Sequence, residues 1–254
     1  MKRRHVALCG VVLASVSLVM SRPCLGDMRD GDADAAEMEM HHLHILLNHG
    51  ITMVTEGSNL VMLAGMGAAP SLDRPTLRHG QMMIANGREL ILRSLDGPEM
   101  ASHSKGVHMA SPLVRYTREL GEAMLAYMKH LEKLDVDRMS SRRTMTLQRV
   151  NVILNHALEM ASEGASMIML ARMGMAGGVD RLSLEHGERI VSHARHLYRE
   201  AMDSDAMKNL RESGVTRETA PMINLTRELA EDVSRIIELL ARMPPPSSMA
   251  PPSR

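Results

Sequence analysis

The chain has 254 residues, of which 24% are charged and 44% are apolar, enough for a packed core in one or two domains. It has no Phe, no Trp and only three Tyr, so it lacks the aromatic side chains on which single-stranded nucleic acid stacks. Basic and acidic residues balance at 30 each, which argues against binding to a duplex backbone. We therefore expect no nucleic-acid partner.

Residues 1–26 predict a secretory signal peptide. A basic start at residues 2–5 precedes an apolar run from Val6 to Met20. That run is shorter than the roughly 20 residues that a helix needs to span a bilayer. We expect cleavage near Gly26, a periplasmic or secreted protein, and no stable membrane span after cleavage.

Both cysteines, Cys9 and Cys24, belong to this predicted signal peptide. The mature chain would then contain no thiol, which excludes disulfides, zinc–thiolate sites and cysteine nucleophiles. A site for a soft metal would have to use methionine thioethers and histidine imidazoles. The chain is rich in both, with 26 Met and 13 His.

An internal repeat organises the rest of the chain. Residues 47–100 align without a gap onto residues 154–207, at an offset of 107, and the similarity resumes at 117–120 and 226–229. The residues that both copies keep include Met53/Met160, Glu56/Glu163, Gly57/Gly164, His79/His186 and Gly80/Gly187. The predicted segments are a flexible mature N-terminus at 27–37, a first repeat at 38–135, a linker at 136–145, a second repeat at 146–243, and a disordered Pro/Ser tail at 244–254.

Each repeat predicts three helices. The first helices, 38–66 and 145–173, contain no Pro and have apolar residues at helical spacing. The second helices begin near Pro75 or Ser183 and end near Asp96 or Asp203, and the third run from Pro112 to about Asp135 and from Pro221 to about Met243. The predicted fold class is all-α: a helical bundle built from two tandem three-helix repeats with internal pseudo-twofold symmetry. Conserved positions between the copies include glycines inside helices, which predicts a close approach of the first and second helices.

One face of each first helix carries an imidazole, a thioether and a carboxylate, because residues three and four apart share a face. These two stripes are His49, Met53 and Glu56 in the first repeat and His156, Met160 and Glu163 in the second. If the first and second helices are antiparallel across a short loop, Glu56 is level with Asn86 and Glu163 is level with His193. Nearer the loop, the thioethers of Met62 and Met66 or of Met169 and Met173 would gather with His79 or His186.

Thioether and imidazole together suit copper, especially Cu(I), whereas imidazole with carboxylate suits iron, zinc or manganese. The candidate metal ligands are His49, Met53, Glu56, His79, His156, Met160, Glu163, His186 and His193. We expect the second repeat to bind more tightly, since His193 and His196 add imidazoles where the first repeat has Asn86 and Glu89. The cluster of His41, His42 and His44 is interpreted as a collector of metal on the surface.

Packing explains the same residues equally well, because methionine is a good gap filler in a core without Phe. The leading hypothesis is an exported protein that binds a transition metal ion, copper before iron or zinc, for storage, buffering or delivery, with a metal-delivery or envelope protein as a further partner. The alternative is a metal-free periplasmic interaction or adaptor module with a Met-packed core. A third hypothesis is an iron-dependent redox enzyme, although no motif of a known catalytic site is found.

Overall fold

The structure is a computed structural model that describes residues 30–67, 73–103, 112–133, 142–174, 178–205, 207–208 and 220–243. Every regular element in these ranges is a helix, so the all-α prediction is confirmed for this part of the chain. None of the described helices has the length and apolarity needed to cross a membrane. The predicted signal peptide and the predicted Pro/Ser tail lie outside the described residues.

The first half of the chain forms α1 (Asp30–Gly65), α2 (Asp73–Asp96), the short α3 (Pro98–His103) and α4 (Pro112–Leu131). The second half forms α5 (Arg142–Arg172), α6 (Asp180–Asp203) and α8 (Ala220–Leu240). The first helix begins earlier than expected, so residues 30–37 are helical instead of a flexible terminus. That segment contains no Pro and includes three Ala, which favour helix, and its acidic residues suit the first turns of a helix.

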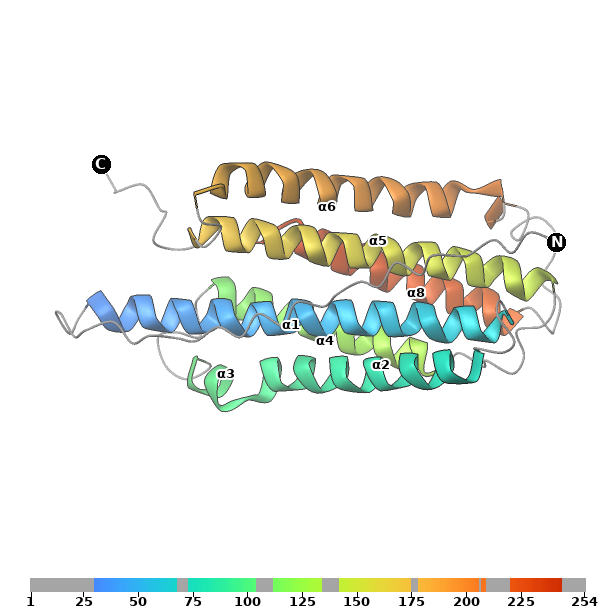
Figure 1. Ribbon diagram of the computed structural model, residues 1–254, viewed down its shortest axis with the longest axis horizontal. Coiled ribbons are helices and arrows are strands. Elements are labelled where there is room, and N and C mark those ends of the chain that lie inside the picture. The colour runs from blue at the N-terminus through green and yellow to red at the C-terminus, as the bar shows by residue number, and fades with distance from the viewer. Residues whose placement is uncertain are drawn as a thin grey trace, which may run out of the picture.

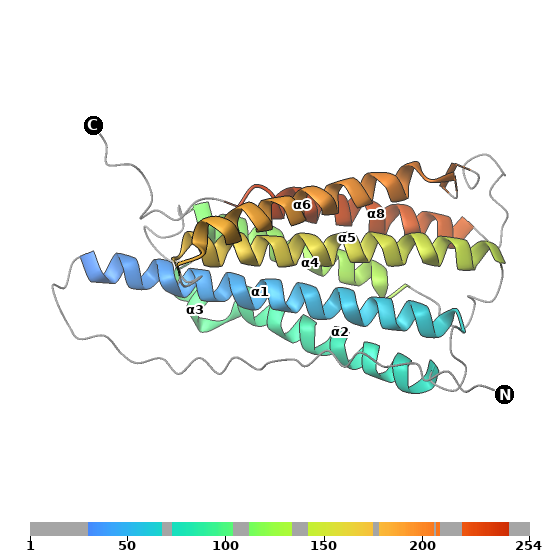
Figure 2. The same ribbon diagram turned by 45° about the horizontal axis from the view of Figure 1, so that its top comes forward.

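The helices form two layers. Figure 1 shows α6, α5, α1 and α2 side by side in one layer, with α4 and α8 behind them. Packing is closest between α1 and α2 and between α5 and α6, while α1 lies against α5 and α4 against α8. After the turn to the view of Figure 2, α2 and α6 still lie at opposite edges of the bundle. The central pair α1 and α5 therefore joins the two halves of the chain.

Methionine fills much of the core. The fully or nearly fully buried methionines are Met40, Met62, Met100, Met124, Met128, Met169, Met207, Met222 and Met243. An unbranched, polarizable side chain adapts to the irregular gaps that a core without Phe or Trp leaves. The packing interpretation of methionine is therefore supported at these positions.

Glycine pairs set the distance between neighbouring helices. A Cβ built on Gly57 would lie 2.6 Å from the carbonyl oxygen of Gly80, and one built on Gly164 would lie 2.7 Å from that of Gly187. Such distances leave no room for a side chain, so the close approach predicted from the repeated glycines is confirmed. Gly50 of α1 meets Gly87 of α2, and Gly164 of α5 also meets Val191 of α6 while Ile168 meets Gly187, so both helix pairs are antiparallel.

Candidate metal centre

The interface between α1 and α5 is antiparallel and polar. Asn48 donates from Nδ2 to Oγ of Ser166 over 3.1 Å, and Oγ of Ser162 donates to the backbone carbonyl of Asn48 over 3.1 Å. Thr52 lies one turn further along α1 and donates to Oγ of Ser162 over 3.5 Å. These contacts show which residues of the two helices stand at the same level, and they place the centre of the interface between the two predicted stripes.

The carboxylates of the two stripes interact across this interface. Partial burial raises the pKa of Glu56, and the charges of Glu159 and Glu163 raise it further. Partial burial also raises the pKa of Glu163, as does the charge of Glu159, whereas the charge of His156 lowers it. We call Glu56, His156, Glu159 and Glu163 the carboxylate patch. It combines residues of both halves on one face, whereas the sequence suggested a separate site in each half.

One imidazole of the patch already contacts a carboxylate. Nδ1 of His156 lies 3.4 Å from Oε2 of Glu159, with 57% of the His156 side chain and 19% of the Glu159 side chain exposed. Glu159 was not among the predicted ligands, because the first repeat has Thr52 at that position and the stripe on each first helix was defined by residues common to both copies. The spacing of three residues between His156 and Glu159 is the signal that identifies the pair.

The predicted pairing of the first and second helices is wrong in register. Because Gly57 lies opposite Gly80, Glu56 is level with Gln81 and not with Asn86, a shift of five residues or about 7.5 Å along the helix axis. In the second half the contact of Gly164 with Gly187 places Glu163 level with Glu188 and not with His193. The prediction aligned the two helices from the position of the loop that joins them. In the structure, close packing at the glycines decides which residues lie opposite each other. The imidazole of His193 therefore does not lie level with Glu163, as the expectation of tighter binding in the second repeat assumed.

The remaining predicted ligands are dispersed. His49 and His156 are exposed on the central helices, and His79, His186 and His193 are exposed on α2 and α6. Met53 and Met160 are partly buried, with Cβ of Met53 3.1 Å from a Cβ built on Gly87 of α2. Within the described ranges, no three His, Cys, Asp or Glu side chains are close enough together to hold one metal ion. A metal ion on the carboxylate patch would therefore need thioether or water to complete its coordination.

The expected surface cluster of histidines is largely internal. His44 is completely buried and His41 is 6% exposed, and only His42 of the three is partly accessible. The spacing of three residues puts His41 and His44 on one side of α1, and that side faces the core. The interpretation of this cluster as a surface collector is therefore wrong for His41 and His44.

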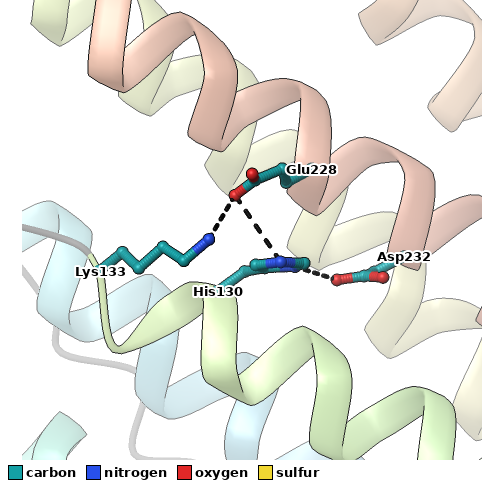
Figure 3. Close-up of polar contacts among 4 residues, drawn as sticks. All are labelled: His130, Lys133, Glu228 and Asp232. Atoms are coloured by element: carbon teal, nitrogen blue, oxygen red, sulfur yellow. Dashed lines mark hydrogen bonds and ion pairs between the residues drawn. The ribbon is translucent and has the colours of Figure 1, made fainter.

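A second polar network joins α4 to α8 and was not predicted. Nδ1 of His130 lies 2.5 Å from Oδ2 of Asp232, and its Nε2 lies 3.7 Å from Oε2 of Glu228 (Figure 3). Lys133 donates to the same Glu228 oxygen over 2.8 Å. The network connects the two halves of the chain behind the central helices. His130 and Lys133 lie 102 and 95 residues from their partners Asp232 and Glu228, so no local spacing in the sequence predicts the network.

Comparison of the chain with models of known families, with curated proteins and with solved structures finds no match.

Proposed function

We propose that this chain is an exported protein that binds a transition metal ion, with copper favoured, for storage, buffering or delivery. The observation that carries the proposal is the position of Glu56 on α1, where partial burial and then the charges of Glu159 and Glu163 on α5 raise its pKa. A bound cation would relieve the repulsion between these charges. Its binding would also displace protons, because metal ligands must be deprotonated.

The composition of the patch favours a divalent ion. Carboxylate and imidazole ligands bind Cu²⁺ more tightly than the other divalent ions of the first transition row, and Zn²⁺ next to it binds less tightly. Met53 and Met160 lie on the same two helices, and their thioethers are soft ligands of the kind that bind copper. An ion held by few protein ligands exchanges readily, and ready exchange suits buffering or delivery better than a permanent structural role.

A competition titration tests this proposal. The metal-free full chain and a chromophoric chelator compete for Cu²⁺ at pH 7, and the titration is repeated with Glu56→Gln, Glu163→Gln and His156→Ala. We expect each substitution to weaken binding by about tenfold, which corresponds to roughly 1.4 kcal/mol. When the titration is repeated at lower pH, binding should weaken as protons compete for the raised pKa of Glu56, and this pH dependence should be smaller in Glu56→Gln.

His42→Ala is the matched control, because His42 is a partly accessible imidazole that lies fourteen residues from Glu56 on α1, about 21 Å along the helix axis. It should leave the affinity unchanged. If His42→Ala weakens binding as much as His156→Ala, the metal binds to surface histidines without preference and the proposal fails. It fails as well if none of the patch substitutions has an effect.

A metal-free interaction module is the second candidate, and exposed apolar side chains on the central helices support it. Leu63 on α1 is 39% exposed, and Ile153 and Leu170 on α5 are 38% and 36% exposed. Large apolar side chains that remain accessible can contribute to a partner interface. If the unmodified chain is folded but binds no metal ion in any of the titrations, this second function is favoured over the first.

We propose in addition that the two halves are tandem copies related by a pseudo-twofold axis. Helices α2 and α6 begin and end at the same offset of 107 residues, and the Gly57–Gly80 contact recurs as Gly164–Gly187. An experimental structure would test this symmetry by superposition of the halves. Mass spectrometry of the mature N-terminus would test export, which requires cleavage near Gly26.

A further inference from the structure

His44 is held in the core with one ring nitrogen available for a ligand. Its Nδ1 lies 3.4 Å from Oγ1 of Thr117, and its ring centre lies 5.2 Å from that of Tyr116. Among the described residues, its buried Nε2 has no hydrogen-bond partner. Burial, and then the charge of His41, lowers the pKa of His44 to about 3, so the ring is neutral at pH 7. With Nδ1 as the donor to Thr117, Nε2 presents a lone pair to the interior.

Two thioethers stand at the level of the buried histidines. Met169 and Met173 follow Ser166 at spacings of three and seven residues, so they share the face of α5 that contacts α1. The antiparallel register of that interface places Met173 level with His41 and Met169 within one residue of the level of His44. Met169 is 1% exposed, and Met173 packs against the core.

We propose that His41, His44, Met169 and Met173 form a buried site for Cu(I). Neutral imidazole and thioether are the soft ligands that this ion prefers. A monovalent ion also suits this position, because the side chains of Thr117 and Tyr116 against His44 are uncharged, and neither supplies a counter-ion to a buried divalent charge.

The opposite end of the α1–α5 interface provides an internal comparison. The positions equivalent to His41 and His44 are Gln148 and Asn151, and the thioethers there are Met62 and Met66. Gln148 donates from Nε2 to Sδ of Met222 over 3.6 Å, and Asn151 donates to Oε1 of Gln148 over 3.4 Å. Amides have replaced both imidazoles while the thioethers are retained. Only the end that contains the histidines should therefore bind Cu(I).

This site does not depend on the carboxylate patch. The patch consists of partly exposed carboxylates and one imidazole, whereas the buried site has no carboxylate. The two also differ in the ion they favour, so substitutions at one should leave binding at the other unchanged. The failure of either proposal can therefore be recognised without the other.

An anaerobic competition titration with Cu(I), supplied with ascorbate and bathocuproine disulfonate as the competing chelator, tests the site in the full chain. His41→Gln and His44→Asn convert the site into its counterpart at the other end. We expect each to weaken Cu(I) binding by at least about a hundredfold, because loss of a direct ligand should exceed the roughly 10–100-fold effect of losing an outer-shell partner. Met62→Leu and Glu56→Gln are the controls and should have no effect.

X-ray absorption gives a second readout that does not depend on affinity. The copper-loaded chain should show sulfur neighbours, and these should be lost in a Met169→Leu, Met173→Leu double variant, which retains apolar side chains in the core. Far-UV circular dichroism establishes that each variant is folded. The proposal is overturned if the folded His44→Asn variant binds Cu(I) as tightly as the unmodified chain, or if only nitrogen and oxygen neighbours are found.

Discussion

Alanine at Gly57 would test whether glycine sets the distance between α1 and α2. A Cβ at this position would lie 2.6 Å from the carbonyl oxygen of Gly80, well inside the 3.4 Å at which ordinary van der Waals contact begins. The obstacle is the backbone of the neighbouring helix, so no side-chain rotation can relieve it. Overpacking of this kind costs about 1–3 kcal/mol, and a clash with backbone belongs at the upper end of that range.

Alanine also gains helix stability over glycine by about 1 kcal/mol, which offsets part of this cost. We therefore expect Gly57→Ala to reduce the free energy of unfolding by about 2 kcal/mol. For a chain of this size the melting temperature should fall by roughly 4–8 °C. Ala85→Gly on the exposed side of α2 is the control, since it changes helix propensity without touching the contact.

Combined substitutions give a sharper test, measured as free energies from urea unfolding. Gly57→Ala with Gly80→Ala should be less destabilising than the sum of the two, because both act on one contact and the helices separate only once. Gly57→Ala with Gly164→Ala should be additive within about 0.5 kcal/mol, because the two glycines belong to different helix pairs. A higher melting temperature for Gly57→Ala would refute the assignment of a spacing role to glycine.

Tyr127→Phe should lower the free energy of unfolding, measured in urea titrations, by about 1–3 kcal/mol. The buried hydroxyl of Tyr127 donates to Oδ1 of Asn155, and the substitution leaves that oxygen without this donor. An effect below about 0.5 kcal/mol would contradict the importance of this bond. Lys133→Met should move the pKa of Glu228, which the hydrogen bond from Lys133 lowers, back up toward 4.5 in an NMR titration. Since the pKa of Glu228 is lower in the folded than in the unfolded chain, the pair stabilises the fold above the unfolded value and this contribution is lost as the pH falls through the folded value. The variant and the unmodified chain should therefore differ in stability at pH 7 and converge in acid, and a constant difference across this range would argue against the ion pair as its cause.

The helical architecture could be predicted because it depends on local signals. The second helices end at Asp96 and Asp203 as expected, and α4 begins at Pro112, where proline suits the first turn. The start of α1 was missed because the assignment began with the first amphipathic residues near Met38, whereas the helix continues back through three Ala to an acidic first turn at Asp30. Local composition thus identifies a helix more reliably than it identifies its first residue.

For the candidate site, the sequence could predict the types of residue involved but not how the helices bring them together. The stripe residues Glu56 and Glu163 do interact, because helical periodicity places them on one face of each central helix. Glu56 and Glu163 interact across the two halves because α1 packs against α5. The lengths of the loops in the sequence do not predict this packing. Periodicity did not predict the burial of His44 either, because the sequence does not show that its face of α1 contacts Thr117 of α4.

The positions of these contacts along the chain also have a consequence for the order of folding. The Gly57–Gly80 and Gly164–Gly187 contacts each close a short loop, whereas His130 and Asp232 are 102 residues apart. Short loops close with a smaller loss of entropy, so the α1–α2 and α5–α6 hairpins should form before α4 meets α8. In pulse-labelled hydrogen exchange the hairpin amides should be protected first, and simultaneous protection of α4 and α8 would contradict this order. The chain would then pass through a state of two formed hairpins whose central polar faces have yet to join.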